Sequence, residues 1–158
     1  MKKVYTIDLS VSGIKELQNG LKEYEKWLKK KSDELCKRLA DMGAVKAEIG
    51  FSSAYYDGNN DFTITVEERG ENCYAVKASG ATVLFVEFGS GLIGYGHPEP
   101  HGMGPGTYPG KGHWDDPNGW WYAHGQHSHG NPPNMPMYNA VKELEQELAR
   151  VVKEVFAD

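Results

Sequence analysis

The sequence SGIKELQNGLKEYEKWLKKKSDELCKRLADMG, residues 12–43, holds the longest regular pattern in the chain. Apolar residues recur in it at every seventh position: Ile14, Leu21, Leu28, Leu35 and Met42. Residues seven apart return to nearly the same side of an α-helix, so the pattern predicts an amphipathic helix from about residue 12 to 42. Ser10 or Ser12 is expected to cap its start, and Gly43 to end it.

This predicted helix is long for a chain of 158 residues. About thirty residues at the usual rise extend over roughly 45 Å. One interpretation is a helix that lies across a sheet. The other is that part of its apolar stripe, near Trp27, contacts another subunit.

Strand patterns follow the helix. The segments at 47–56, 61–70 and 72–80 are predicted strands, and Phe62, Ile64 and Val66 alternate with polar residues as in a half-buried strand. Turn-forming residues at 57–60 and 69–72 separate the three segments, which predicts an antiparallel meander packed on the helix. Residues 81–88 are almost continuously apolar, and periodicity leaves open a helical turn or a fourth strand.

A second helix is predicted at the C-terminus, from Met135 to Phe156. Asn134 is its expected cap, and Pro136 suits an early helical position. Its apolar face comprises Met137, Val141, Leu144, Leu148, Val151, Val152 and Val155. The sequence therefore predicts an α+β fold in which a long N-terminal helix and a C-terminal helix pack on a small antiparallel sheet of three to four strands. We expect a single domain over residues 1–158, with a long irregular insertion loop at 89–134.

Composition excludes several classes of protein. The formal net charge of −5 disfavours nucleic acid as a partner, because binding phosphates requires a basic face. No apolar run approaches the roughly 18 residues that a membrane span needs. The first ten residues lack the apolar core of a signal peptide, and two distant cysteines do not make a disulfide framework. These features predict a protein made in the cytoplasm.

The insertion has an unusual composition. All eight prolines and all six histidines of the chain lie between His97 and Pro136, with three of the four tryptophans. Proline and glycine occur too densely for regular structure. Disordered segments are poor in aromatic residues, so these rings are expected to pack on the body or against a partner.

Three kinds of site remain open for the insertion. A metal site could use His97 and His101 with the later histidines at 124, 127 and 129, although no helix aims them and neither cysteine is near. An enzyme could use Glu87, Asp115 and Asp116 as acid–base groups, although no nucleophile or phosphate-binding motif accompanies them. An interaction surface is the third, because tryptophan and tyrosine are enriched at binding hot spots.

Three segments carry a resemblance to a known family. An apolar run ends in Glu-Phe-Gly-Ser-Gly within Val86 to Gly91, and a Gly-Trp-Trp-Tyr segment covers Gly119 to Tyr122. The start of the last helix, Pro133 to Ala140, corresponds to a Pro-x-x-(Phe/Met)-Tyr/Arg-Asn-Ala pattern. In this order they resemble the head–tail joining proteins, also called tail-completion or neck proteins, of long-tailed bacteriophages. The His- and Gly-rich insertion departs from the family pattern.

The resemblance implies a structural role without catalysis, cofactor or metal. It implies a homo-oligomeric ring, typically a hexamer, in the neck of the virion, where it contacts the tail tube or terminator and the head connector. It implies no specific nucleic acid and no membrane as a partner, and production in the cytoplasm of the host bacterium. The alternative function is a metal-dependent enzyme or a metal- or ligand-binding module that uses the His-rich loop.

The residues expected at a protein interface are Glu87, Trp114, Trp120, Trp121 and Tyr122. Glu87 is expected to pair with a cation across a subunit boundary or to hold the first backbone amides of the loop, unless it is merely an exposed side chain. The three aromatic residues at 120–122 are interface anchors in one interpretation. In the other they form a small satellite core beneath the loop.

Overall fold

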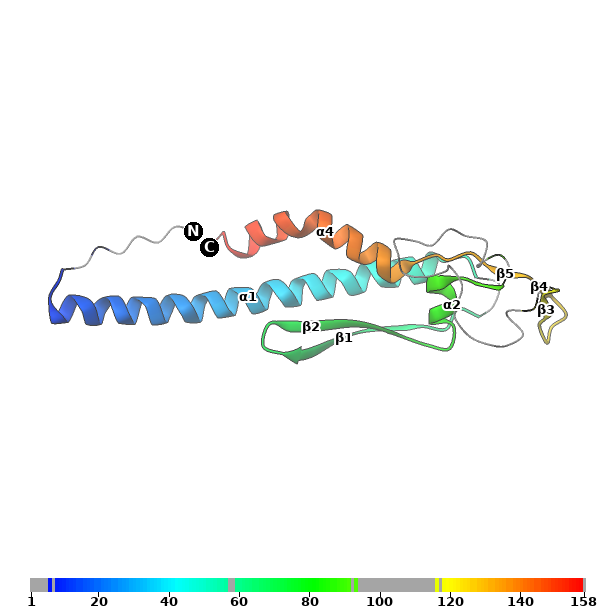
Figure 1. Cartoon of the computed structure of the whole chain (residues 1–158), viewed down its shortest axis with the longest axis horizontal. Helices are drawn as coiled ribbons and strands as arrows, with labels where there is room; N and C mark the ends of the chain where they lie inside the picture. The colour runs from blue at the N-terminus through cyan, green and yellow to red at the C-terminus, as the bar shows by residue number, and fades with distance from the viewer. Residues whose placement is uncertain are drawn as a thin grey trace.

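A computed structural model describes residues 6, 8–56, 59–91, 93, 116 and 118–157. The fold is α+β, as predicted: a long N-terminal helix and a C-terminal helix pack with small antiparallel sheets. Figure 1 shows α1 along the length of the molecule, with α4 on one side of it and the β1–β2 hairpin on the other. The elements are α1 (Val11–Ser53), β1 (Thr63–Gly70), β2 (Cys73–Ser79), α2 (Val83–Phe88), β3 (Trp120–Trp121), β4 (His127–Ser128), β5 (Gly130–Asn131) and α4 (Pro136–Val155).

Helix α1 begins where the sequence predicts and continues much further. The Ser10 hydroxyl accepts a hydrogen bond from the Gly13 amide at 3.1 Å, which caps the helix. The predicted stop at Gly43 and the predicted strand at 47–56 are both wrong, because α1 runs on to Ser53. The cause is a row of small residues that sequence reasoning did not count as a helical face.

That row brings α4 close to α1. Ala40, Gly43 and Ala47 are buried at helical spacing. A Cβ on Gly43 would lie 2.9 Å from Leu144 Cδ1, so the Leu144 side chain of α4 would have to shift to admit a larger residue there. Glycine inside a helix costs about 1 kcal/mol relative to alanine, and the contact with α4 offsets that cost. Ion pairs Lys46–Glu143 and Arg38–Glu154 join the same two helices at the surface.

The β1–β2 hairpin covers another side of α1. Val66 pairs with Val76 in antiparallel register, and the inward positions of β1 are half-buried, as the alternating pattern predicts. The predicted turn at 69–72 is present, with Asn72 at a φ of 56°. The Tyr74 hydroxyl donates to Asp33 of α1 at 3.0 Å. The meander has no third strand from 47–56, and the second two-stranded sheet is the β3–β4 pair.

The core lies at the end of α1 where α2 crosses it. Phe51, Val83 and Val86 are buried together, and the Phe51 ring stacks on Phe62 with centroids 5.2 Å apart. Residues 83–88 of the apolar segment form the helix α2, so of the two alternatives that periodicity left open the helical one is confirmed. Among the described helices, none is long and apolar enough to cross a membrane.

Helix α4 has the predicted bounds within a residue but a different start. Pro136 opens the helix as predicted. Met135, not Asn134, occupies the cap position, in a left-handed conformation and without a side-chain cap. Val151 and Val155 are buried against the body, whereas Val141 and Leu148 remain 52% and 43% exposed. The predicted apolar face is thus only partly covered.

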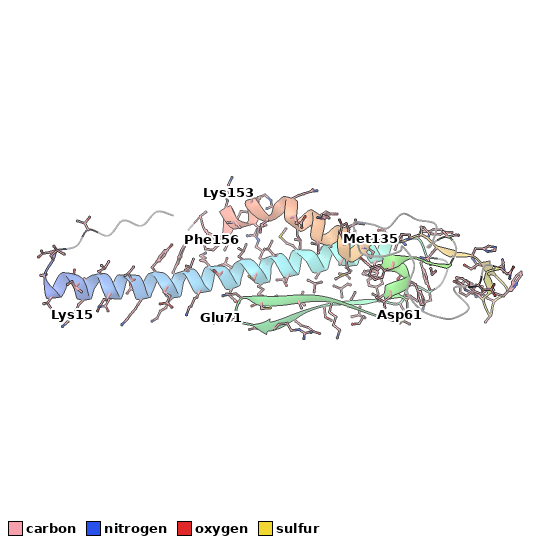
Figure 2. All side chains as sticks on the ribbon, in the orientation of Figure 1. Lys15, Asp61, Glu71, Met135, Lys153 and Phe156 are labelled. Carbon is pink, nitrogen blue, oxygen red and sulfur yellow. The ribbon has the colours of Figure 1, made fainter. Side chains whose placement is uncertain are left out.

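Most of the N-terminal half of α1 extends beyond the other described helices and strands. Figure 2 shows Glu71, at the hairpin turn, and Phe156, after α4, both near the middle of α1, with Lys15 far beyond them. The Phe156 ring meets the edge of Trp27 at 5.8 Å. We call residues 11–31 of α1 the arm.

Candidate functional site

Glu87 of α2 holds the start of α4. The side chain is 5% exposed, and its two carboxylate oxygens accept hydrogen bonds from the backbone amides of Met137 at 2.9 Å and Tyr138 at 3.1 Å. The first amides of a helix have no partner within the helix, and a negative charge there also complements the helix dipole. Glu87 therefore supplies the cap that Met135 lacks. The interpretation of Glu87 as an exposed side chain is wrong, and the amides it holds belong to α4 rather than to the start of the loop.

Two opposing effects act on this carboxylate. Burial raises the pKa of Glu87 above its ordinary value, and the hydrogen bonds from the Met137 and Tyr138 amides lower it, with burial the larger effect. Loss of hydration thus outweighs what the two amides return. The cap is therefore buried at a cost to the fold.

Two asparagines tie the chain before α4 to the body. The Asn134 amide group donates to the Tyr55 carbonyl at 2.9 Å and accepts from the Tyr55 amide at 3.0 Å. Asn131 donates to the Phe85 carbonyl at 3.0 Å and accepts from the Ser90 hydroxyl, in a buried position. The segment that returns from the insertion is therefore held both on α2 and on the residues just after α1.

The two ends of the insertion lie side by side. Isolated antiparallel bridges join Ser90 with Asn131 and Gly91 with Gly130. Gly130 has a φ of 104°, and a Cβ there would lie 1.8 Å from the Ser90 carbonyl oxygen, so only glycine allows this approach. The segments that carry the family resemblance at 86–91 and 133–140 thus form one junction. We call the residues 86–91 and 128–138 the loop junction.

A small hairpin projects from the junction. Trp120 pairs with Ser128 and Trp121 with His127. Its turn is closed by a hydrogen bond from the Tyr122 amide to the Gln126 carbonyl at 2.8 Å, with Gly125 at a φ of 83°. Figure 1 shows β3 and β4 at the end of the molecule opposite the free end of α1. The expectation that the insertion at 89–134 is irregular is corrected here, because the short strands β3, β4 and β5 form within it.

Aromatic rings and imidazoles stack along this hairpin. The Trp121 ring lies 4.5 Å from the His127 ring, and His127 meets the edge of His129 at 4.7 Å between centroids. Tyr122 stacks on His124 at 5.4 Å with the rings nearly parallel. Trp121 is nevertheless 70% exposed. A ring this exposed does not form a core, so the satellite-core interpretation is wrong for Trp121.

The other predicted site residues have mixed outcomes. Trp120 and Tyr122 are half-buried and meet edge to face at 6.4 Å. Trp114 lies outside the described residues, as do Asp115, His97 and His101. Asp116 is exposed and accepts from the Asn118 amide at 2.8 Å within a turn. Of the expected acid–base groups, Glu87 is used for capping, and no described contact joins it to the histidines.

Sequence reasoning did not identify Asn131, Asn134 and Ser90 as junction residues. A signal was present in Asn131-Pro-Pro-Asn134: prolines have no N–H, so side-chain amides must supply the donors there.

In the part of the chain that the structure describes, no group of three or more His, Cys, Asp or Glu side chains is arranged to hold a metal ion.

An apolar groove runs beside the junction. It has a volume of about 400 Å³ and is lined by residues of β2, α2 and α4: Ala78, Val83, Leu84, Glu87, Phe88, Met137, Tyr138 and Val141. Leu84 and Val141 at the groove are 44% and 52% exposed. A groove with few polar groups suits apolar side chains of another protein better than a polar substrate.

Comparison with protein-family models, with curated proteins and with solved structures found no significant match to this chain.

Proposed function

We propose that this chain is a structural protein of a long-tailed bacteriophage that joins the head connector to the tail. It acts through protein–protein contacts in a homo-oligomeric ring and performs no catalysis. The main support is the loop junction, where two of the three segments that resemble the neck proteins lie against each other: Glu87 accepts from the Met137 and Tyr138 amides, and the Asn134 amide donates to the Val86 carbonyl. The third segment, Gly119–Tyr122, extends from that junction.

The role also suits the exposed surfaces. Trp121 is held by His127 in a closed hairpin yet is 70% exposed, which suits a preorganised contact residue better than a core residue. Subunits of a ring contact their neighbours through two different surfaces. The projecting hairpin and the arm, at opposite ends of the molecule, are separate surfaces of this kind.

The test is to place the chain in the particle. A tagged copy should appear at the neck of intact virions by electron microscopy. Particles assembled without the chain should accumulate as separate heads and tails. Complete infectious particles made without it would refute the proposal.

A point variant tests the hairpin. Trp121→Ala should leave the thermal unfolding of the purified chain within about 0.5 kcal/mol of wild type, because the side chain is mostly in water. It should nevertheless reduce particle assembly. Ile49→Ala is the matched control, since Ile49 is 63% exposed on α1, away from the hairpin. Equal effects of both variants on assembly would contradict a specific role for Trp121.

A further inference from the structure

The arm has one covered side. Every residue of the arm that is buried or half-buried belongs to a single stripe, and all its other residues are exposed. The stripe comprises Gly13, Leu17, Gly20, Tyr24, Trp27 and Lys31. Its steps of three and four residues keep these positions on one side of an α-helix. We call them the covered stripe.

Leucines of the arm show that the cover lies outside the helix. Leu21 and Leu28, beside the covered stripe, are 49% and 41% exposed. Leu17, on the stripe, is half-buried. The residue type and the helix are the same, and the lower exposure repeats along one side only. A neighbour that lies along this side of the arm therefore causes the difference.

Described parts of the chain account for the two ends of the stripe. A Cβ on Gly13 would lie 2.2 Å from the Asp8 carbonyl oxygen, so the chain before α1 passes directly over the first turn of the helix. The Phe156 ring, after α4, meets the edge of Trp27 at 5.8 Å. Figure 2 shows that α4 and the β1–β2 hairpin both end near the middle of α1. Of the described helices and strands, none extends over Leu17 and Gly20.

The segment before Asp8 has the length that this gap requires. Gly13 and Trp27 are 14 residues apart, which is roughly 21 Å along a helix. Residues 1–7, when extended, cover roughly 23 Å. Because Asp8 already lies over Gly13, a segment that continues from it toward the body reaches Trp27.

The side chains of this segment suit an apolar stripe. Its sequence is Met-Lys-Lys-Val-Tyr-Thr-Ile. Thr6 is exposed, and side chains of an extended segment alternate, so Tyr5 and Ile7 of such a segment would face the helix. Gly20, in the middle of the stripe, has no side chain to hold the segment away.

Charges fix the direction of the segment. Lys3 and Lys2 would lie roughly 16 and 20 Å from Asp8 in an extended segment, level with about residues 24 to 26 of α1. Glu23 and Glu25 stand at that level of the arm. Opposite charges therefore come together when the segment runs from Asp8 toward the body.

We propose that residues 1–7 fold back and lie extended along the covered stripe of their own chain. The segment then holds the arm helical beyond the ends of α4 and the hairpin, and its apolar contacts offset the cost of about 1 kcal/mol that Gly20 brings to a helix. The row of Ile14, Leu21 and Leu28 beside it stays exposed. This contact lies within one chain and is independent of the proposed function.

Nuclear Overhauser spectra of the isotopically labelled full-length chain test the contact directly. Cross-peaks should join side chains of residues 4–7 with Leu17 or Tyr24. In an equimolar mixture of labelled and unlabelled chains, a spectrum filtered for contacts between copies should lack these cross-peaks. The proposal is overturned if the first spectrum lacks them, and also if the second contains them, because a second copy would then cover the stripe.

Hydrogen exchange tests what the segment does for the arm. Deleting residues 1–7 should make the amides of residues 14–24 exchange at least about tenfold faster, because a lone helix of this length is marginally stable. The amides of residues 40–51, where α4 packs, should be unchanged and so report that the body stays folded. An arm that exchanges at the same rate after the deletion would contradict the proposal.

A matched pair of substitutions repeats this test in the full-length chain. Leu17→Ser, on the covered stripe, should speed exchange of the arm amides. Leu21→Ser makes the same change at a position that is 49% exposed and should have a much smaller effect. Equal effects of the two substitutions would show that Leu17 has no partner along the stripe, and the proposal would be wrong.

Discussion

Replacing Glu87 with alanine should destabilise the whole fold, since it removes the contact that joins α2 to the start of α4. The carboxylate accepts two backbone hydrogen bonds, at 2.9 and 3.1 Å, and hydrogen bonds to a charged group contribute about 1.5–3 kcal/mol each. The cost of burying the charge, visible in its raised pKa, reduces that gain. Loss of a helix cap typically costs about 0.5–2 kcal/mol, so a loss of about 2–3 kcal/mol for Glu87→Ala is expected once the small cavity is included.

The assay is unfolding by heat and by urea, followed by circular dichroism. For a chain of this length, each kcal/mol shifts the melting temperature by about 2–4 °C, so Glu87→Ala should melt roughly 5–10 °C below wild type. Glu48→Ala is the control, because Glu48 is exposed on α1 and its removal should change stability by less than about 0.5 kcal/mol. If Glu87→Ala unfolds like Glu48→Ala, the capping role is wrong.

The same site determines a pH dependence. Because the pKa of Glu87 is raised in the fold, the folded chain keeps a proton that the unfolded chain releases as pH rises past about 4.5. The stability that Glu87 contributes is therefore complete below its unfolded pKa and is lost as pH rises through its folded pKa. Glu87→Gln does not titrate, so its stability should gain on that of wild type as pH rises through this window. Urea unfolding at a series of pH values measures the difference in free energy of unfolding between Glu87→Gln and wild type. If wild type instead becomes more stable relative to Glu87→Gln as pH rises, the raised pKa is wrong.

Two further substitutions test how the insertion is held. Gly130→Ala should cost more than about 3 kcal/mol, because its Cβ would meet the Ser90 oxygen at 1.8 Å, whereas Gly125→Ala, at a positive φ but in open space, should cost roughly 1–2 kcal/mol. Equal losses in urea unfolding would refute the close approach at the junction. Asn134→Ala removes two hydrogen bonds to the main chain of Tyr55 and should cost about 2 kcal/mol of stability. The backbone amide of Tyr55 should then be less protected from hydrogen exchange. Unchanged hydrogen exchange of the Tyr55 amide would contradict the role of Asn134 in holding this segment.

The family resemblance remains a proposal about function, since it rests on short segments. The structure adds a physical reason for those segments to occur together: Glu87 and α4, and Ser90 and Asn131, are partners across some forty to fifty residues of sequence. Such partners are expected wherever this junction is built, whatever the insertion between them contains.

Periodicity alone determined the elements whose residues interact locally. The apolar row with a spacing of seven residues predicted the start of α1 near residue 12, with Ser10 or Ser12 as its cap. Alternation and turn residues predicted β1 and β2, and Pro136 predicted the start of α4. Helices and hairpins are formed by contacts a few residues apart, so their signals are present in any short window.

Only the tertiary structure decided the features that depend on distant partners. Gly43 lies buried inside α1 instead of ending it, with Leu144 of α4 beside it. Glu87 is a buried cap rather than an exposed side chain because the amides of Met137 and Tyr138 reach it from fifty residues away. Whether Val141 is covered or bare likewise depends on where α4 lies on the body. In each case the residue type allows both outcomes, and the free energy of a contact made by remote parts of the chain selects one.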